Sequence, residues 1–467
     1  MSAAVLLAGC AVGPDYKRPE VSVPPAFRGQ EAPSATSIAD VGWWAVFRDE
    51  TLVSLIRAAL AESYDVRIAA ARVLDARAQV TIARSFQFPD LSANASAPYT
   101  RTWGNRASSV EFSGPFTSSS LSSRETFTPL GTLDLAWELD LWGRLRRVTE
   151  AARGELLAST EAQHFVVTTL VSDVATAYFQ LRELDLELEI ARRTFASRQD
   201  SLRLVRMRFE GGVAAQIDVR QAEVLLYTAA ETIPDVERRI EQTENLISVL
   251  LGQNPTAVAR GRTLPDNLAL VAPVVPAGLP SSLLERRPDI RQAESLLAAA
   301  TARIGVAKAD YFPRVTLTGA AGAGGIAVSG NWFGPFGIAS VGPQVNLPIF
   351  NMGRVRAGVD SAQARAEAAL LQYQTTIQQA FRDVADALVE HRKRREFRAQ
   401  QEPLVASLRD AAQLANMRYQ GGVTSYLEVL DTERQLFDAE LALAQAQRDE
   451  LLAVVRIYRA LGGGWTT

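Results

Sequence analysis

The pentapeptide Phe209-Glu210-Gly211-Gly212-Val213 recurs 210 residues later as Tyr419-Gln420-Gly421-Gly422-Val423. The same offset relates three further pairs of segments, namely Gly143-Arg144 and Gly353-Arg354, Asp173-Val174-Ala175 and Asp383-Val384-Ala385, and Leu251-Gly252 and Leu461-Gly462. A tandem repeat of this length more often builds one body with internal pseudo-symmetry than a series of separate domains. We therefore expect two copies of one structural unit, repeat 1 at residues 46–252 and repeat 2 at residues 281–462.

The composition disfavours several classes of function. The 467 residues include two histidines, His164 and His391, and one cysteine, which leave little material for a zinc site, a histidine acid/base pair or a disulfide framework. The net charge of −3 lacks the basic surplus of nucleic-acid-binding proteins, and no apolar run reaches the ~18 residues of a transmembrane helix. We therefore expect no enzymatic activity, cofactor, bound metal ion or nucleic-acid partner.

The cysteine lies in a segment that resembles a bacterial lipobox. Leu7-Ala8-Gly9-Cys10 follows a short apolar run and precedes a proline-rich stretch. We expect residues 1–9 to be a lipoprotein signal peptide, Cys10 to be acylated after cleavage, and residues 10–45 to form a lipid-anchored N-terminal segment. The apolar run is short and no Lys or Arg precedes it, which a start codon further upstream would explain. A small buried cysteine is the alternative.

Each repeat contains a pair of segments in which apolar and polar residues alternate. Each repeat begins with a helix that ends at a Phe-Pro pair, and the alternating segments follow at about 90–141 in repeat 1 and about 314–349 in repeat 2. Strands of ~10 residues with one apolar and one charged face match an outer-membrane barrel, whose outside is apolar and whose lumen is wet. A half-buried sheet in a soluble sandwich would show the same alternation. We interpret Gly322–Ala327 as a barrel loop, since no helix follows to complete a dinucleotide fingerprint.

A long helix and a shorter return helix complete each repeat. The long helices are expected at about 144–208 and 354–418, each roughly 100 Å long, and the return helices at about 214–251 and 424–461. In the first long helix apolar residues recur every 3.5 residues, the period of helices packed side by side: Leu170, Val174, Ala177, Leu181, Leu184, Leu188, Ala191 and Phe195. The second has His391, Arg394 and Arg398 at equivalent positions, a polar face that borders water or a partner. Residues 253–280 form an equatorial linker and residues 463–467 a C-terminal tail.

Four strands leave two free edges, which hydrocarbon does not tolerate. The chain must therefore assemble with copies of itself, and three copies would give a barrel of twelve strands with a water-filled lumen. The same closure would join the helical hairpins into a tube. The expected fold class is a mixed α and β membrane protein, in which two repeats supply four strands of a trimeric 12-stranded barrel and part of a long periplasmic α-helical barrel. Such an assembly is a conduit.

Several segments resemble the TolC superfamily, and within it the OprM/NodT-like outer-membrane efflux lipoproteins. They are Cys10 to Pro19, Gly42-Trp43-Trp44, Arg286-Arg287-Pro288-Asp289-Ile290-Arg291, and Tyr419 with Gly422-Val423 and Tyr426-Leu427 to Asp431. The resemblance covers essentially the whole chain. It implies a homotrimeric channel in the outer membrane of a Gram-negative bacterium, which works with a periplasmic adaptor protein and an inner-membrane transporter of the RND type. The channel itself would be a passive conduit for small toxic compounds or drugs.

The resemblance also implies roles for residues at the hairpin ends. Leu427 and Asp431 fall at the family's periplasmic constriction, where a ring of leucines would dewet the pore and a ring of carboxylates would repel anions. Asp218, Arg220, Arg418 and Tyr419 would form hydrogen bonds and ion pairs that hold neighbouring hairpins closed. The turns that would meet the adaptor are Gly211, Gly212, Val213, Gly421, Gly422 and Val423. The alternatives are that each charge lies on a solvated helix face and that the glycines serve only the turn.

Two other conduit or structural functions remain open from the sequence. One is a duct of the same build that secretes proteins, and the other is a coiled-coil structural or adaptor protein of the periplasm. The adaptor alternative predicts strands that are buried against helices. An enzyme would need a catalytic role for His164 or His391.

Overall fold

A computed structural model describes residues 11–30, 37–40, 42, 49–101, 125–260, 277–278, 280–328 and 330–463. Cys10, the expected signal peptide and much of the expected linker lie outside these residues, so the acylation of Cys10 stays a prediction. The chain divides into two compact units. The sheet unit comprises the residues up to Arg18, Asp75–Leu156 and Ser295–Leu370, and the hairpin unit comprises Pro19–Leu74, Leu157–Glu294 and the residues from Leu371 onward.

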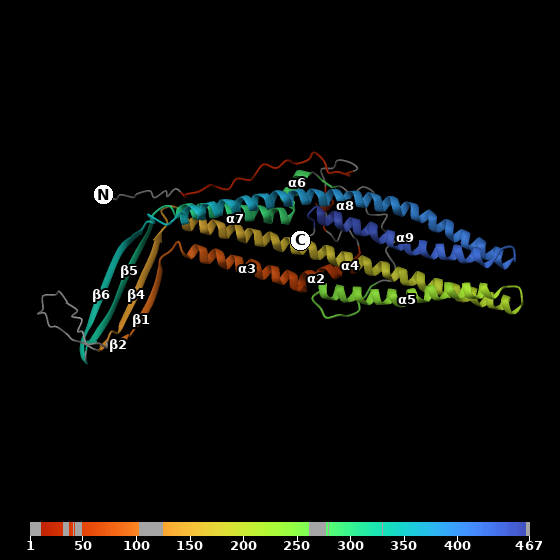
Figure 1. Ribbon diagram of the computed structural model, residues 1–467, viewed down its shortest axis with the longest axis horizontal. Helices are drawn as coiled ribbons and strands as arrows, with labels where there is room; N and C mark the ends of the chain where they lie inside the picture. The colour runs from red at the N-terminus through yellow and green to blue at the C-terminus, as the bar shows by residue number, and fades with distance from the viewer. Residues whose placement is uncertain are drawn as a thin grey trace. The chain divides into compact units, whose positions relative to one another are not determined.

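An antiparallel sheet forms the centre of the sheet unit. Its strands are β1 (Asp90–Ser96), β2 (Tyr99–Arg101), β3 (Glu125–Phe127), β4 (Leu130–Leu139), β5 (Arg314–Val328) and β6 (Asn331–Asn346). β4 pairs with β1 and β5, β5 also pairs with β6 and with the short β3, and β3 pairs with β2 (Figure 1). Among the described residues, β1 and β6 each have one paired neighbour, so the sheet has two free long edges.

Gly322–Ala327 is not a loop, as the sequence suggested, but part of β5. These residues pair with β6, and the first of them also pair with β4. Glycine is required because the strands approach closely: a Cβ atom on Gly322 would lie 2.1 Å from the carbonyl oxygen of Gly131. A glycine-rich strand has the composition of a loop, which explains the wrong prediction.

The pairing register separates apolar from polar side chains across the sheet. One matched row contains Leu91, Leu135, Gly319 and Val341, and the adjacent row contains Ser92, Asp134, Ala320 and Ser340. Successive side chains of a strand point to opposite faces, so the two rows lie on opposite faces of the sheet. On the polar face Asp134 accepts hydrogen bonds from Asn94 (2.6 Å) and Thr132 (2.9 Å).

The apolar face of the sheet is open in the described part of the chain. Leu91 and Val341, at its two edges, expose 67% and 76% of their surface, and Leu133 between them is also exposed. A buried sandwich layer, or a sheet packed against helices as in the adaptor alternative, would have covered these side chains. Both alternatives therefore disagree with the described sheet.

The helices of the chain follow the order expected for two repeats. Repeat 1 contains α2 (Glu50–Glu62), α3 (Tyr64–Ser85), α4 (Arg144–Glu210) and α5 (Gln216–Leu250), and repeat 2 contains α6 (Pro280–Arg286), α7 (Pro288–Ala309), α8 (Arg354–Gln420) and α9 (Tyr426–Ala460). A short 3₁₀ helix, η1 (Ile38–Asp40), precedes them. α8 continues through Pro403 and α5 through Pro234. In the part of the chain that is described, no helix combines the length and the apolar character needed to cross a membrane.

The start of α4 explains why β4 ends at Leu139 and not near residue 141. Asp140 accepts hydrogen bonds from the backbone N–H groups of Leu145 (3.0 Å) and Arg146 (2.9 Å), which have no partner within the helix. β6 likewise ends at Asn346, three residues before the predicted limit.

The apolar stripe predicted along α4 is largely buried in the hairpin unit. Six of its eight residues are buried, and Leu188 and Phe195 are half-buried. The polar face of α8 has a partner inside the same chain: Arg394 pairs with Asp449 (2.9 Å) and Arg398 with Glu450 (2.9 Å) of α9, while His391 is buried. At the two arginines the partner of this face is therefore α9 of the same chain, and Arg394 also borders water, with 42% of its side chain exposed.

Candidate functional site at the hairpin tips

Each hairpin tip turns through a glycine in the left-handed conformation. Gly212 and Gly422 have φ values of 72° and 73°. After each helix the backbone closes back on the last turn: Val213 N donates to Arg208 O (2.9 Å) and Val423 N to Arg418 O (3.0 Å). This is the hydrogen bonding of a glycine-terminated helix. A Cβ atom would meet nothing within 4 Å at Gly212 or at Gly422, so the glycines are required by conformation and not by space.

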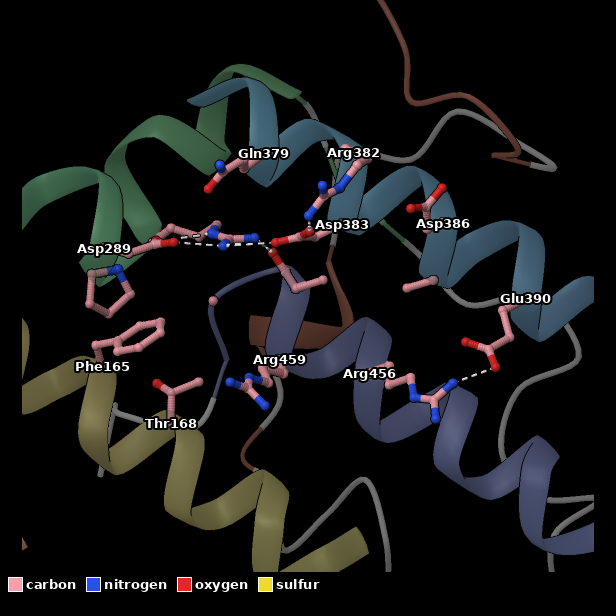
Figure 2. A pocket seen from close by; sticks show the side chains of 15 residues that line it. Phe165, Thr168, Asp289, Gln379, Arg382, Asp383, Asp386, Glu390, Arg456 and Arg459 are labelled. Atoms are coloured by element: carbon pink, nitrogen blue, oxygen red, sulfur yellow. Dashed lines mark hydrogen bonds and ion pairs between the residues drawn. The ribbon is translucent and has the colours of Figure 1, made fainter. Parts of the chain in front are cut away.

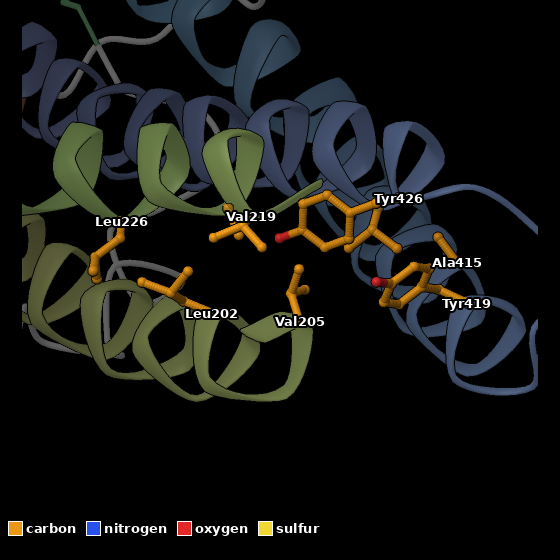
Figure 3. Packing of buried hydrophobic residues seen from close by; sticks show 9 residues of the cluster. Leu202, Val205, Val219, Leu226, Ala415, Tyr419 and Tyr426 are labelled. Carbon is orange, nitrogen blue, oxygen red and sulfur yellow. The ribbon is translucent and has the colours of Figure 1, made fainter. Parts of the chain in front are cut away.

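A shared hydrophobic cluster joins the two tips of one chain (Figure 3). All four helices contribute to it, and its members are Leu202 and Val205 of α4, Val219, Ala222 and Leu226 of α5, Ala415 and Tyr419 of α8, and Tyr426 and Val429 of α9. The Tyr419 and Tyr426 rings lie edge to face with their centroids 5.1 Å apart. The two tips of a single chain are therefore packed together.

Arg208 adds a polar contact between the same two tips. From the last turn of α4 its Nη1 donates to the carbonyl oxygens of Tyr419 (3.0 Å) and Gln420 (3.1 Å) at the end of α8. Its guanidinium carbon lies 4.7 Å from the centroid of the Tyr419 ring, within the range of a cation–π interaction. Arg208 was not among the predicted site residues, although it stands 210 residues before Arg418, which was.

Tyr419 belongs to the interior of the tip. It is 5% exposed, and its hydroxyl group has no hydrogen-bond partner among the described residues. Burial, together with the negative charge of Asp218, raises the pKa of Tyr419, whereas Arg208 opposes the shift. Tyr419 thus contacts the repeat 1 hairpin of its own chain.

The predicted charged residues of the tip have local partners. Asp218 caps its own helix, since its Oδ2 accepts a hydrogen bond from Ala215 N (3.1 Å). Arg220 pairs with Glu223 one turn along α5 (2.7 Å). Arg418 is exposed and has a long contact to Glu428 (3.8 Å). The structure brings Tyr419 near Asp218 but does not bring Arg220 or Arg418 to that pair.

Leu427 and Asp431 lie one turn apart on the exposed side of α9. Leu427 exposes 58% of its surface. Asp431 accepts hydrogen bonds from Gln435 (2.6 Å) and Arg434 (3.2 Å), both on its own helix. Their counterparts in repeat 1 are Ile217, which is also exposed, and the uncharged Gln221. At this pair of aligned positions, a carboxylate is therefore present in only one of the two hairpins.

A second polar site is built by the Arg286–Arg291 motif within the hairpin unit (Figure 2). Arg287 is buried and donates to Asp289 (2.6 Å), to Asp383 of α8 (3.3 Å) and to the carbonyl oxygen of Ala460 at the end of α9 (3.1 Å). It borders a pocket of about 600 Å³. The motif thus ties the start of α7 to the two helices of the repeat 2 hairpin.

The two histidines lie on different long helices. His164 Nδ1 of α4 lies 3.2 Å from Glu161 Oε2 on the same helix, and His391 is buried on α8.

The sheet with one apolar face, the two free edges and the long paired hairpins together define a channel protein of the outer membrane. A family model of the outer membrane efflux protein matches residues 55–253 and 279–463. The chain belongs to this family, and the resemblance to the TolC superfamily is thereby confirmed. The family is one of efflux proteins and not of enzymes.

Known efflux proteins and solved channel structures are similar to this chain over nearly its full length. The solvent efflux pump outer membrane protein SrpC of Pseudomonas putida is 37% identical over 476 residues, which is 100% of this chain and 98% of the relative. The cation efflux system protein CusC of Escherichia coli is 34% identical and covers 99% of this chain and 97% of its own. The outer-membrane channel OprN superimposes with a TM-score of 0.85 at 34% identity, covering 98% of this chain and 100% of its own. The open state of the Neisseria gonorrhoeae MtrE outer membrane channel superimposes with a TM-score of 0.84 at 30% identity, covering 98% of this chain and 99% of its own.

Proposed function

We propose that this protein is the passive outer-membrane conduit of a tripartite efflux pump and functions as a lipid-anchored homotrimer. The observation that carries the proposal is the sheet, whose register puts apolar residues on one face and polar residues on the other and leaves β1 and β6 with free edges. Three copies would close these edges into a barrel with the apolar face toward lipid. A lipid on Cys10 would fix the assembly in the membrane.

The internal repeat indicates that the exposed faces of α5 and α8 are covered by a second copy of the chain. Within one chain α4 contacts α9, so the 210-residue offset predicts that α8 contacts α5 of the next copy. Tyr227 of α5 is 63% exposed, whereas its counterpart Phe437 of α9 is 4% exposed. Phe397 of α8 is 50% exposed, whereas its counterpart Glu187 is buried. Large exposed apolar side chains thus lie at positions that are covered where the two hairpins of one chain meet.

The exposed turns are the surface that we assign to the periplasmic adaptor. Val213 and Val423 project from the tips and are largely exposed, each after a glycine turn. The adaptor would in turn link the channel to an inner-membrane transporter of the RND type, which would supply the energy. Relatives are named for solvent and cation efflux, so the proposed cargo is small toxic compounds or drugs.

The gate that we propose consists of Leu427 and Asp431 on α9. In a trimer these residues would form a ring of leucines and a ring of carboxylates, which dewet the pore and repel anions. Arg418, with its long contact to Glu428, has donors available for a neighbouring copy. Asp218, Arg220 and Tyr419 would support the closed arrangement from the sides. The Arg208 contact and the shared cluster resist movement of one hairpin against the other and so favour the closed state.

The function is tested by efflux in cells. A strain that lacks its own outer-membrane efflux channels would receive this protein with the adaptor and transporter encoded beside its gene, and accumulation of a fluorescent pump substrate would be measured. The proposal expects low accumulation with the full set and high accumulation without this protein. Low accumulation in its absence, with adaptor and transporter present, would contradict the assigned role.

A further inference from the structure

Two buried carboxyl groups lie on α4, on a different helix from the gate residues that we propose on α9. Glu183 and Glu187 are one turn apart, and their side chains are 1% and 4% exposed. A carboxylate that is removed from water is costly unless each of its oxygens has a partner. The partners of these two groups therefore decide which of them carries a charge.

Both carboxyl oxygens of Glu187 have a hydrogen-bond partner, whereas only one oxygen of Glu183 does. Glu187 Oε1 accepts a hydrogen bond from Gln445 Nε2 of α9, and its Oε2 accepts one from Arg239 Nη1 of α5, both at 2.9 Å. Glu183 Oε2 accepts one from Arg448 Nη1 of α9 at 3.1 Å. Glu183 Oε1 is buried and has no hydrogen-bond partner among the described residues.

The remaining charges around Glu183 are already engaged with one another. Arg448 directs its Nε (3.0 Å) and Nη2 (2.8 Å) to Asp449 Oδ1, and Arg394 of α8 pairs with the other oxygen of Asp449 (2.9 Å). The cluster thus includes Glu187 on the same helix, Arg239 on α5, Arg394 on α8, and Arg448 and Asp449 on α9. Three arginines match three carboxyl groups, but only Arg448 contacts Glu183, so a negative charge on Glu183 would be balanced at one oxygen and leave the other without a partner among the described residues.

We propose that Glu183 is protonated in the folded protein and acts as a proton-operated latch between α4 of repeat 1 and α9 of repeat 2. As a neutral acid it tolerates burial, and its O–H group can donate toward the neighbouring Glu187 carboxylate. Loss of the proton places a second anion beside Glu187 in the absence of water. Because Glu187 lies on the same helix, their repulsion does not itself push α9 away. The new charge does demand hydration, which water can supply only where α9 moves off α4, and this demand acts against the attraction of Arg448.

The electrostatics of the site agree with this geometry. Burial, together with the adjacent Glu187 carboxyl group, raises the pKa of Glu183 to about 8, against the opposing effects of Arg448 and Arg239. The latch would therefore release between neutral and alkaline pH.

The latch is present in only one of the two repeats. The counterparts of Glu183 and Glu187 in α8 are Lys393 and Phe397, both exposed. The acid pair therefore belongs to the junction of the two hairpins within one chain. Its consequence for transport rests on the proposed function: a gate carried by the repeat 2 hairpin would open more readily at alkaline pH.

Infrared spectroscopy of the full-length protein in detergent tests the latch directly. The C=O stretching band of a protonated carboxyl group should be present at slightly acidic pH and disappear as the pH is raised through the alkaline range. E183Q should abolish the band, and the matched control E189Q, which alters an exposed carboxylate on the same helix, should leave it intact. Absence of the band in the unmodified protein, or its persistence in E183Q, would overturn the proposal. If E183Q failed to assemble, E187Q would serve instead. Removal of the neighbouring negative charge should move the pH midpoint at which the Glu183 band disappears to a lower value. An unchanged midpoint would also overturn the proposal.

Hydrogen exchange supplies a second readout at the junction of α4 and α9. After correction for the intrinsic pH dependence of exchange, protection of both helices should fall by up to about tenfold per pH unit in the unmodified protein as the pH rises towards about 8, because in this range the closed state keeps the Glu183 proton and the open state releases it. In E183Q the corrected protection should not depend on pH in this range; the same dependence in both proteins would exclude the latch. Failure to conduct ions at any pH would remove the channel function but not the latch, because neither readout requires transport.

Discussion

Arg208 and Arg418 occupy the same position in the two repeats, yet their environments differ. Arg208 donates to two carbonyl oxygens of the companion hairpin and lies against the Tyr419 ring, whereas Arg418 is exposed beside Glu428. A charged donor that reaches two carbonyl groups in a partly buried site is worth more than an exposed ion pair. Arg208 therefore holds the tips of one chain together, and Arg418 is the arginine that we propose for contacts between chains.

Replacing Arg208 with alanine should loosen the tip. We expect a loss of about 2 kcal/mol, from the lost hydrogen bonds of a charged group. The measurement is hydrogen exchange of the end of α8, where protection should fall roughly 30-fold. R203A is the matched control, because Arg203 is exposed and pairs only with Asp200 on its own helix among the described residues. Equal protection in R208A and R203A would show that the contact does not hold the tip.

Glu183 should make the stability of the protein depend on pH. Its pKa is about 8 in the fold and 4.5 ordinarily, so the folded state keeps a proton that the unfolded state releases between these values. The stability from this group is complete below its ordinary pKa, is lost as the pH rises to about 8, and does not change further above it. Denaturation of the detergent-solubilised protein should show a loss of roughly 1 kcal/mol per pH unit in this window relative to E183Q. Parallel pH curves for the two proteins would refute the assignment.

Single residues of this kind were the hardest to predict from the sequence. Glu183, Arg208 and Tyr178, which donates to Asp49 at 2.8 Å, make contacts across long sequence separations. Such contacts leave no local pattern in the sequence, so no role was predicted for these three side chains. Alignment of the two repeats was the sequence signal that could have identified Glu183 and Arg208. At the offset of 210 residues, Glu183 aligns with a lysine and Arg208 with an arginine.

At the scale of elements, local patterns sufficed for most of the helices and strands. Alternation located the strand pairs, and the glycine turns located the hairpin tips, with helix ends within two residues of the predicted limits. The second half of β5 was missed because close strand approach demands glycine, which alone suggests a loop. The polar positions on α8 could not be assigned because their partners lie on α9.

The turn at Gly422 should require glycine more strictly than its neighbour. G422A forces a left-handed conformation on alanine and should cost about 1–2 kcal/mol. Gly421 has no positive φ, so G421A should be nearly neutral and is the matched control. Thermal unfolding of the purified proteins distinguishes the two. Equal melting temperatures would contradict the conformational account of the turn.

α9 should gate the conduit through Leu427 and Asp431. D431A combined with R418A should raise the single-channel conductance in planar bilayers and reduce the preference for cations, because it removes the carboxylate ring and the contact beside it. Q221A, at the repeat 1 counterpart of Asp431, is the control and should leave both properties unchanged. A double variant with the conductance and selectivity of the unmodified protein would exclude this gate.

At the scale of the whole molecule, the repeat explains why one chain is incomplete. The junction of α4 with α9 is satisfied inside the chain, whereas the equivalent faces of α8 and α5 expose Phe397 and Tyr227. The sheet has the same property, with β1 and β6 as open edges among the described residues. Symmetric assembly would satisfy both at once.

A charge at the open helix face should prevent this assembly. Y227E would bury an unpaired carboxylate between copies, a cost of several kcal/mol that should shift the purified protein from trimer to monomer. Y227F is the control, because it keeps a large apolar side chain at the same exposed position. Native mass spectrometry in detergent reports the outcome. A trimer that survives Y227E would place the contact between copies elsewhere.

Planar-bilayer recording of the purified, unmodified protein shows whether this chain forms a passive gated conduit. The account predicts discrete, cation-preferring channels that are small when the gate is closed and that need no energy source. It also predicts that their opening becomes more frequent as the pH rises from neutral to alkaline. Trimers that insert into the bilayer and conduct no ions at any voltage or pH would contradict the account.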